Sequence, residues 1–383
     1  MQFDVAVIGL GAMGSAALFQ LARRGLKVIG LERFQPGHDK GSSHGESRAI
    51  RLGYFEHPSY VPLARRAYEN WAELERLTGE TVLTKTGVLE IGKPGSVIFN
   101  GSLEASRLHG LEHEVLVAAE MRQRYPQFTL PDDYMTVWQP DGGFVRPELA
   151  NRLHLELAQE QGAEMRFGTQ VLGLEPSGGG VRVRTDEGEI VAGRVVVSAG
   201  GWIGDLVPEL KPHLSLARQV LCWFEPRERE AVKPDKLPVF IIDGEDDIAY
   251  GFPDIGSGFK CASHLASGAL SHADDARQDA GPADEARMRD FLDAYLPVAA
   301  GPLRAMNTCF YTKTRDEDFV IDLHPGDNRI VVASPCSGHG YKFASVIGEV
   351  LADLAMEGGT KQDISRFALA RLGGFNQSSP RQA

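Results

Sequence analysis

Residues 1–32 constrain the fold of this chain more than any other segment does. Residues 3–8 form a short, largely apolar run that is typical of a buried parallel strand. The motif GLGAMG (residues 9–14) follows, and apolar residues then recur with helical spacing. A second apolar run, residues 27–31, ends on Glu32. The order of strand, glycine turn, helix and strand predicts a βαβ unit in a parallel sheet.

The spacing of the three glycines has a chemical reason. Gly9 permits a tight turn, Gly11 lets the backbone approach a pyrophosphate, and Gly14 lets the helix pack against the strand. The helix N-terminus then faces the phosphates. Glu32 can accept a hydrogen bond from a ribose 2′-hydroxyl, and its charge disfavours a 2′-phosphate. A merely structural glycine turn is the alternative, but strand, helix and acid occur together here. The unit therefore predicts a dinucleotide, without separating FAD from NAD.

A chain of 383 residues exceeds the size of one compact core, which predicts two domains. We assign the segments that resemble the first unit to a discontinuous dinucleotide-binding domain of about residues 1–80, 146–214 and 315–383. The segments between them contain short strand-like runs, divided by Pro, Gly and Asp turns. They predict an inserted α+β domain with a mixed or antiparallel sheet, about residues 81–145 and 215–314. The expected fold class is α/β, a Rossmann-like domain with a parallel sheet plus this inserted domain.

Two later segments of the first domain have residue patterns that predict their secondary structure. Residues 188–200 predict a hairpin strand followed by a separate buried strand that ends in glycines. Residues 343–356 carry an apolar stripe at helical spacing, and Gly358 is expected to end that helix.

Composition excludes several classes of partner. The formal net charge of −12 argues against a nucleic acid and against an anionic membrane surface. The four cysteines lack zinc-site spacing and suggest no disulfide framework, so we expect no metal and a cytoplasmic location. Residues 5–22 carry no charge, but their glycines and their change from strand to helix period argue against a membrane helix. No pattern of a signal peptide surrounds them.

Three further features carry chemical groups. The segment GSSHGESRAIR (residues 41–51) has no hydrophobic period and holds a histidine and two arginines, so it is either a solvated loop or part of a site. The segment SGHGYKF (residues 337–343) brings Lys342 to a helix N-terminus, where it either caps the helix or faces a developing negative charge. Cys309 is either a buried core thiol or a reactive thiol that attaches a ligand.

Together these segments resemble one family. The chain is similar nearly end to end to the monomeric sarcosine oxidases and their relatives, the N-methyltryptophan oxidases and pipecolate oxidases, which are FAD-dependent amine oxidases. The resemblance rests on the segments FDVAVIGLGAMG, GSSHGESRAIR, YVPLARRAYENW, TGVLEIG, AYGFP, CFYTKTRDEDFVIDLHP, SGHGYKFAS and DISRF. It implies that the first domain binds FAD and that the inserted domain binds the substrate.

The resemblance implies a covalent cofactor. In this family the Cys of a C-x-Y-T segment forms a thioether with the 8α-methyl carbon of the flavin, and residues 309–312 match that segment. Cys309 is therefore the expected attachment site of an 8α-S-cysteinyl FAD, because a thiolate can attack the electrophilic methyl group. The other residues expected at the cofactor are Gly9, Gly11, Gly14, Glu32, His44, Val171, Gly338 and Lys342.

The resemblance also implies roles around the substrate. Arg51 and Lys342 match the pair of cations that binds the substrate carboxylate. Lys260 matches the residue implicated in the oxygen reaction, where a cation stabilises superoxide as it forms. The residues expected to act in catalysis are Arg48, Lys260, His264, Tyr250 and Tyr311. Two departures change the shape of the pocket: Pro335-Cys336 replaces Gly and a large apolar residue, and Ile241 replaces the Met of the sarcosine enzymes.

The reaction implied by the resemblance is the oxidation of a secondary amino acid. A hydride equivalent passes to the flavin, the imine is hydrolysed, and O₂ becomes H₂O₂. Sarcosine would give glycine and formaldehyde, with N-methyl-L-tryptophan and L-pipecolate as alternative substrates. An FAD-dependent dehydrogenase with another acceptor, an NAD-linked dehydrogenase and a nonenzymatic FAD-binding module are the rival functions. We expect a monomer whose partners are a small amino acid and O₂.

Overall fold

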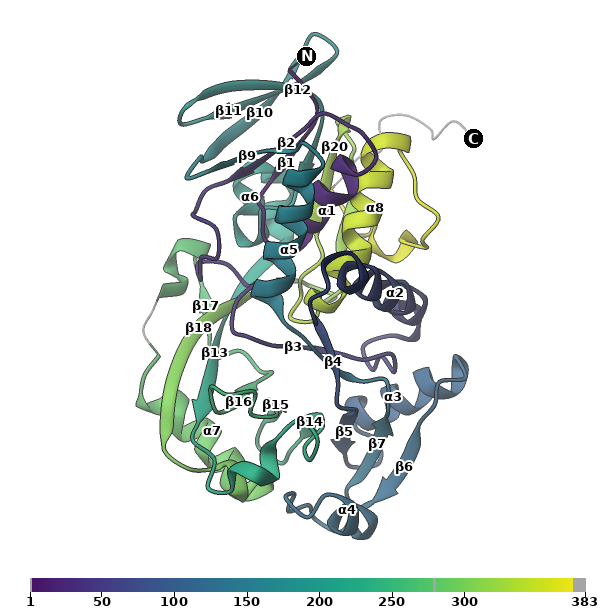
Figure 1. Cartoon of the computed structure of the whole chain (residues 1–383), viewed down its shortest axis with the longest axis vertical. Helices are drawn as coiled ribbons and strands as arrows, with labels where there is room; N and C mark the ends of the chain where they lie inside the picture. Colours follow the sequence, from purple (N-terminus) through teal and green to yellow (C-terminus); the bar gives the residue numbers. More distant parts are fainter. Residues whose placement is uncertain (1, 278–279, 375–383) are drawn as a thin grey trace.

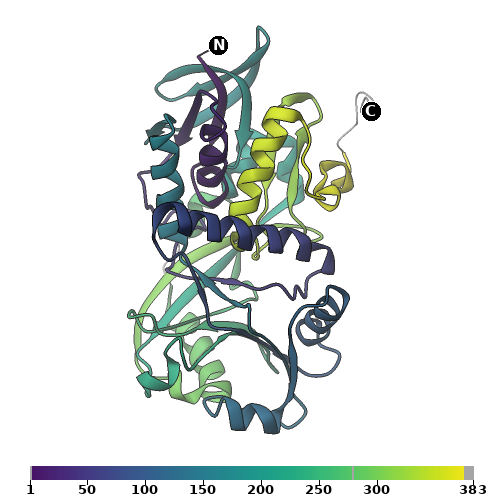
Figure 2. The ribbon, with the colours of Figure 1, turned by 45° about the vertical axis from the view of Figure 1, so that its right-hand side comes forward.

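The computed structural model describes residues 2–277 and 280–374. Two large sheets lie one above the other along the long axis, and helix α2 (Val61–Thr78) crosses the middle of the molecule (Figure 1 and Figure 2). The colours of Figure 1 show that each sheet combines segments that are far apart in the sequence. The space between the sheets is therefore lined by residues from many parts of the chain.

The upper sheet in Figure 1 has a parallel centre. Among the described residues it contains eight strands, and the parallel ones pair in the order β20, β12, β1, β2 and β9. The parallel strands are β1 (Phe3–Ile8), β2 (Val28–Glu32), β9 (Glu164–Phe167), β12 (Gly188–Val197) and β20 (Asp327–Ser334). The strands β10 (Val171–Ser177), β11 (Gly180–Thr185) and β19 (Val320–His324) add antiparallel edges. The parallel sheet expected from the first βαβ unit is confirmed.

Helices bury both faces of this sheet, as a parallel sheet requires. One face packs against α1, α2, α5 and α8 in the largest apolar cluster of the protein. These helices are α1 (Ala12–Ala22), α5 (Pro147–Glu160) and α8 (Ala344–Glu357), together with α2. The short helix α6 (Ile203–Leu206) lies on the other face.

Two sequence expectations in this domain need correction. Residues 188–200 form one long strand, β12, instead of two strands. Its first half pairs with β11 and its second half with both β1 and β20, so continuous pairing keeps it unbroken. Helix α8 begins at Ala344, because residues Tyr341–Phe343 form a 3₁₀ turn.

The lower sheet is mixed, as expected. Nine strands of the described part form it, antiparallel except where β5 and β14 pair in parallel. They are β5 (Val88–Gly92), β6 (Glu114–Val117), β7 (Met135–Gln139), β13 (Leu214–Phe224), β14 (Val239–Asp243), β15 (Ile248–Phe252), β16 (Phe259–Ser263), β17 (Gly268–Leu270) and β18 (Leu303–Thr314). The outer elements are α3 (Val97–Leu108), α4 (Ala118–Arg124) and α7 (Pro282–Tyr295). The domain boundaries stay predictions.

A third, small sheet connects the two halves. It consists of β3 (Arg48–Ile50), β8 (Gly143–Val145) and β4 (Leu83–Lys85), with β8 in the centre. Because β3 immediately follows the segment 41–47, this sheet fixes the position of both Arg48 and Arg51. None of the helices in residues 2–277 and 280–374 combines the length and the apolar character that a membrane crossing needs.

Candidate active site

One cavity of about 890 Å³ brings most of the predicted site residues together. Its walls include the glycine turn after β1, the end of β2, the strands β14, β15 and β18, and the segment before α8. The predicted residues that line it are Gly9, Gly11, Glu32, Arg48, Arg51, Val171, Tyr250, His264, Cys309, Tyr311, Gly338 and Lys342. Gly14, His44 and Lys260 lie behind its walls.

The dinucleotide end of the cavity is held by backbone contacts. Gly9 has a φ of +84°, and a Cβ atom there would meet the carbonyl oxygen of Ser198 at 2.7 Å. Gly14 packs closer still, since a Cβ atom would fall 1.7 Å from the carbonyl oxygen of Gly9. The carboxylate of Glu32 accepts hydrogen bonds from the amides of Leu10 (2.8 Å) and Phe34 (3.0 Å). These contacts leave an open turn at the N-terminus of α1, which suits a pyrophosphate.

The charge of Glu32 is retained in spite of its burial. Desolvation raises the pKa of Glu32, but His38 and the two backbone amides outweigh it, and the net shift is downward. A buried carboxylate with a lowered pKa is a suitable acceptor for a ribose hydroxyl.

Two of the four cysteines line the cavity. Cys309 lies on β18 opposite Gln219 of β13, is 4% exposed, and belongs to the cavity wall. Cys336 lines the same cavity from the loop after β20, and burial raises the pKa of its thiol to about 11. Cys222 and Cys261 belong instead to the apolar core of the lower domain. Cys309 is thus buried and borders the cavity, and Cys336 is a second cavity cysteine for comparison.

Hydrogen bonds and an aromatic ring hold the guanidinium of Arg51 in place. Its Nη2 donates to both carboxylate oxygens of Glu56, at 2.9 and 2.7 Å, and its Nη1 donates to the carbonyl of Gly53 at 3.0 Å. Its guanidinium also lies over the ring of Phe55, 4.0 Å from the centroid. Burial lowers the pKa of Arg51, but Glu56 and Glu90 outweigh it and the net shift is upward. Arg51 therefore stays charged. A ligand in the cavity could replace some of its contacts but not all of them.

Lys342 faces the same end of the cavity. Its Nζ donates to the carbonyl of His339 at 2.7 Å, and its own carbonyl accepts a hydrogen bond from Trp71 of α2. Burial lowers the pKa of Lys342 to about 7, and Arg51 lowers it as well. A carboxylate between Arg51 and Lys342 would raise that pKa again, because an opposite charge favours the ammonium.

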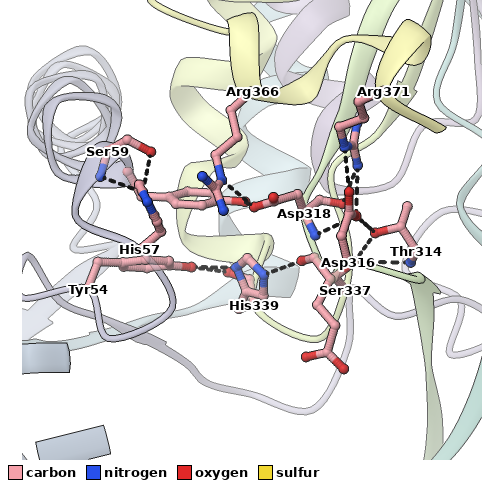
Figure 3. Close-up of polar contacts among 12 residues, drawn as sticks. Tyr54, His57, Ser59, Thr314, Asp316, Asp318, Ser337, His339, Arg366 and Arg371 are labelled. Carbon is pink, nitrogen blue, oxygen red and sulfur yellow. Dashed lines mark hydrogen bonds and ion pairs between the residues drawn. The ribbon is translucent and has the colours of Figure 1, made fainter. Parts of the chain in front are cut away.

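The loop before α8 is fixed by a polar network that Figure 3 shows. The hydroxyl of Tyr54 lies 2.6 Å from His339 Nδ1, and His339 Nε2 lies 3.0 Å from the carbonyl of Glu317. A carbonyl only accepts, so Nε2 carries the proton and Tyr54 donates to Nδ1. Burial lowers the pKa of His339 to about 4, which agrees with a neutral ring. Nearby, Arg366 and Asp318 pair at 2.7 Å and tie the C-terminal segment to the turn between β18 and β19 (Figure 3).

Aromatic side chains form the wall beside these cations. The hydroxyls of Tyr250 and Tyr311 are 3.4 Å apart, and the ring of His264 lies 6.1 Å from that of Tyr311. Gly338 has a φ of +83°, and a Cβ atom there would meet the Tyr311 ring at 2.8 Å. Burial lowers the pKa of His264, so its imidazole is neutral near pH 7. The wall is therefore apolar in its bulk and carries hydroxyl and imidazole groups at its edge.

Lys260 and His44 lie behind the cavity wall. Lys260 Nζ donates to the carbonyls of Gly45 (2.6 Å) and Ser47 (2.7 Å), and it reaches the Ser47 hydroxyl at 3.1 Å. Burial lowers the pKa of Lys260 well below its ordinary value. Burial and Arg48 together lower the pKa of His44 to about 4. Ser47 and Phe252 both line the cavity, and Lys260 Nζ lies 4.5 Å from the centroid of the Phe252 ring, so Lys260 adjoins the cavity through these two residues.

The residues fit FAD. The cradle at Gly9 and Gly14, the charged Glu32 and a cavity that continues past Cys309 to the cations provide places for a dinucleotide, a ring system and an anionic substrate. A comparison with known families decides the class: the profile of the FAD dependent oxidoreductases matches residues 4–354. The chain belongs to this family. The prediction of a flavin enzyme is thereby confirmed, and the NAD-linked alternative is excluded.

Individual members of the family sharpen this assignment. The chain is 40% identical to a monomeric sarcosine oxidase from Bacillus sp. (strain NS-129), over 96% of this chain and 97% of the relative. It is 36% identical to an N-methyl-L-tryptophan oxidase from Yersinia pestis (strain Pestoides F), over 97% of this chain and 100% of the relative. Among solved structures, NikD, an unusual amino acid oxidase essential for nikkomycin biosynthesis, superposes with a TM-score of 0.84 at 27% identity, covering 96% of this chain and 97% of that one. The resemblance stated from the sequence is confirmed.

Sequence reasoning missed three residues near Arg51 and Lys342. Glu56 lines the cavity, Tyr54 holds His339, and Glu90 is fully buried beside Arg51. Only Glu90 gave a readable signal, since it is a charged residue inside the apolar strand segment TGVLEIG. The described residues contain no cluster of three or more His, Cys, Asp or Glu side chains that could hold a metal ion.

Proposed function

We propose that this protein is a flavoprotein oxidase of N-methylated or otherwise secondary amino acids, with sarcosine as the leading substrate. The overall reaction would convert sarcosine, O₂ and H₂O into glycine, formaldehyde and H₂O₂. N-methyl-L-tryptophan and L-pipecolate are the alternative substrates. The observation that carries the proposal is that Arg51 and Lys342 line the same cavity as the glycine turn and Cys309.

The two cations recognise the substrate carboxylate. Arg51 offers a planar fork of N–H donors and Lys342 a point charge, a combination that favours one carboxylate over a neutral group. The carboxylate would displace Glu56 from Arg51 or share Arg51 with it, since Glu56 also lines the cavity. Lys342, with its pKa of about 7, would become fully protonated as the carboxylate arrives.

The aromatic wall receives the amine. Tyr250, Tyr311 and His264 lie beside the cations and line the cavity. A neutral His264 can accept a proton from the substrate ammonium, which leaves the amine neutral and able to lose a hydride from its neighbouring carbon. Closely packed rings also exclude water from this region until an imine product is released.

The cofactor would be attached through Cys309. When bound, the flavin supplies the oxidising group that takes two electrons from the substrate and passes them to O₂. Cys309 would fix its dimethyl edge, and Lys260 would stabilise negative charge that develops during the oxygen reaction from behind the segment 45–47. The relative named monomeric supports a monomer, and we place the enzyme in the cytoplasm.

Covalent attachment is tested by acid precipitation of the purified protein. The parent should yield a yellow pellet, whereas Cys309→Ser should release its flavin to the supernatant and lose most activity. Cys336→Ser is the matched control, because it removes the other cavity thiol and should keep the pellet yellow. Flavin that is released completely from the mature parent would refute the attachment.

The function itself is tested by turnover of a small panel of amino acids. Sarcosine, N-methyl-L-tryptophan, L-pipecolate and L-proline are compared in air, with H₂O₂ and aldehyde measured together. An oxidase forms one H₂O₂ per substrate consumed. Substrate consumption that needs an added acceptor and forms no H₂O₂ would identify a dehydrogenase instead.

A further inference from the structure

Glu90 is a buried carboxylate beside the proposed carboxylate site. It lies in the middle of β5, is 0% exposed, and aligns with Ile241 of β14 and Val137 of β7. Its Oε2 accepts a hydrogen bond from Gln139 Nε2 at 3.0 Å, and its Oε1 lies 3.4 Å from Arg51 Nε. An ionised group at such a place costs free energy unless a partner compensates its charge. Arg51 is that partner.

Arg51 therefore stands between two carboxylates. Glu56 lies on the cavity side of the guanidinium, and Glu90 lies behind it and is not among the described residues that line the cavity. A substrate carboxylate would be the third anion around one guanidinium. Several carboxylates so close together in a buried site cannot all stay ionised at low cost, so one must turn away or take up a proton.

The two acids differ in how they can respond. Glu56 borders the cavity, which leaves space beside its carboxylate, and its pKa of about 2 keeps it charged. Glu90 is enclosed by its strand neighbours and by Gln139, so it has no room to leave. A change of protonation is the response that remains open to Glu90.

We propose that Glu90 tunes the affinity of the site for a carboxylate: it balances Arg51 from behind in the free enzyme and takes a proton from solvent when an anion pairs with Arg51 from the front. The proton forms an O–H bond on Glu90, and no electron is transferred. The inference rests on the proposed function in so far as the natural anion is the substrate carboxylate.

The electrostatic surroundings agree with this role. Burial raises the pKa of Glu90 to about 7, while Arg51 and Lys342 lower it and Glu56 raises it. Tyr68 also faces this group, and its pKa lies well above its ordinary value, so Tyr68 stays neutral. Lys342 titrates in the same range, with a pKa of about 7, so the experiment must distinguish the protonation of Lys342 from that of Glu90.

Acetate is a suitable probe, because it is a simple carboxylate that stays ionised between pH 6 and 9. Its dissociation constant is measured on the holoenzyme from the change in flavin absorbance, for the parent and for Glu90→Gln. In the parent, acetate affinity should fall as the pH rises through about 7. Glu90→Gln should bind acetate about ten-fold more tightly than the parent at pH 9 and equally well at pH 6.

A purely structural role gives the opposite sign. If Glu90 only holds Arg51 in place, Glu90→Gln should bind acetate more weakly at every pH, and that result would overturn the proposal. Glu349→Gln is the matched control, since Glu349 pairs with Arg66 at 2.9 Å outside the cavity and should leave the acetate profile unchanged. A parent that shows no acetate binding would also overturn the proposal.

Proton uptake provides a second readout that does not require the Gln variant to fold. In weakly buffered solution at pH 8, Lys342→Met should still take up protons when acetate binds, and these protons belong to Glu90. No uptake in that variant would contradict the proposal. A parent with the predicted acetate profile that oxidises no secondary amino acid would refute the proposed function and leave the role of Glu90 standing.

Discussion

The two ends of the cavity hold their charged side chains in different ways. At the dinucleotide end, the Glu32 carboxylate accepts hydrogen bonds from the backbone amides of Leu10 and Phe34, and its pKa is lowered. At the other end, the proposed substrate end, Arg51 is bound by the side chains of Glu56 and Glu90, and the pKa values of Glu90 and Lys342 both lie at about 7. The first arrangement is fixed by the fold, whereas the second can change its partners and its protonation.

This difference matches what each end must do. A cofactor that stays bound needs a rigid cradle whose charge does not vary with pH. A substrate that binds and leaves in every cycle needs charges that other groups balance in its absence. We therefore expect substitutions at the dinucleotide end to affect cofactor content, and those at the substrate end to affect ligand affinity.

The largest effect is expected at Gly14. In Gly14→Ala the added Cβ would fall 1.7 Å from the carbonyl of Gly9, so α1 must move away from the turn that faces the pyrophosphate. The protein should be purified with almost no flavin, which absorbance at 450 nm measures. Gly359→Ala is the control, because no heavy atom lies within 4 Å of its added Cβ. Full flavin content in Gly14→Ala would contradict the claim that flavin binding depends on a rigid dinucleotide end.

Lys260→Met should impair mainly the oxygen reaction. A fixed cation near developing superoxide is worth ~3–4 kcal/mol in comparable oxyanion sites, which is about two to three powers of ten in rate. Reoxidation by O₂ should therefore slow far more than anaerobic reduction by substrate, and stopped-flow absorbance measures both. In the parent, reoxidation should also slow as the pH rises through the lowered pKa of Lys260. Equal losses in both steps would mean that Lys260 only supports the segment 45–47.

Arg51→Met and Lys342→Met should each weaken carboxylate binding by roughly 1.5–3 kcal/mol, the range of a hydrogen bond to a charged group. Flavin content should stay at the parent level, since neither residue contacts the glycine turn. The measurement is the dissociation constant of sarcosine from anaerobic reduction. Arg66→Met, which removes an arginine outside the cavity, should change nothing. A loss of flavin in either cavity variant would show that the two ends are not separate.

The smallest effect concerns acid stability. The folded-state pKa of Glu56 is lowered from 4.5 to about 2, because Arg51 outweighs burial. A lowered carboxyl pKa contributes stability above the unfolded pKa, and that stability is lost as the pH falls from about 4.5 toward 2. Glu56→Gln should remove about 1–3 kcal/mol of this dependence, measured by urea unfolding between pH 3 and 6. Identical pH profiles for the two proteins would show that the pair with Arg51 adds no stability.

The same contrast explains what could be predicted from the sequence. The dinucleotide end is local: strand, glycine turn, helix and Glu32 follow one another, so spacing alone predicts it, and β1 spans the expected residues 3–8. The structure of residues 188–200 was harder to predict, because the pairing of β12 with three other strands is not visible in its own sequence. The periodicity of α8 was readable, but the 3₁₀ turn that precedes it was not.

The substrate end is assembled from distant segments. Arg51, Lys342 and Cys309 were expected from the family resemblance, since no local pattern links β3, β18 and the segment before α8. Glu56 was missed because an acid in a polar loop is unremarkable in sequence, and its contact with Arg51 depends on how the loop folds back. The expected position of Lys260 at the flavin stays a prediction, because its ammonium contacts the segment 45–47 behind the cavity wall.

The most direct test of the account compares sarcosine with N-methylpropylamine, in which an ethyl group replaces the carboxylate. Each is mixed anaerobically with the holoenzyme, and the loss of flavin absorbance is followed over a range of concentrations. Recognition by Arg51 and Lys342 predicts that sarcosine bleaches the flavin and that the amine reacts at least ten-fold less efficiently. Equal reduction by both compounds would contradict the central claim that this end of the cavity is a carboxylate site.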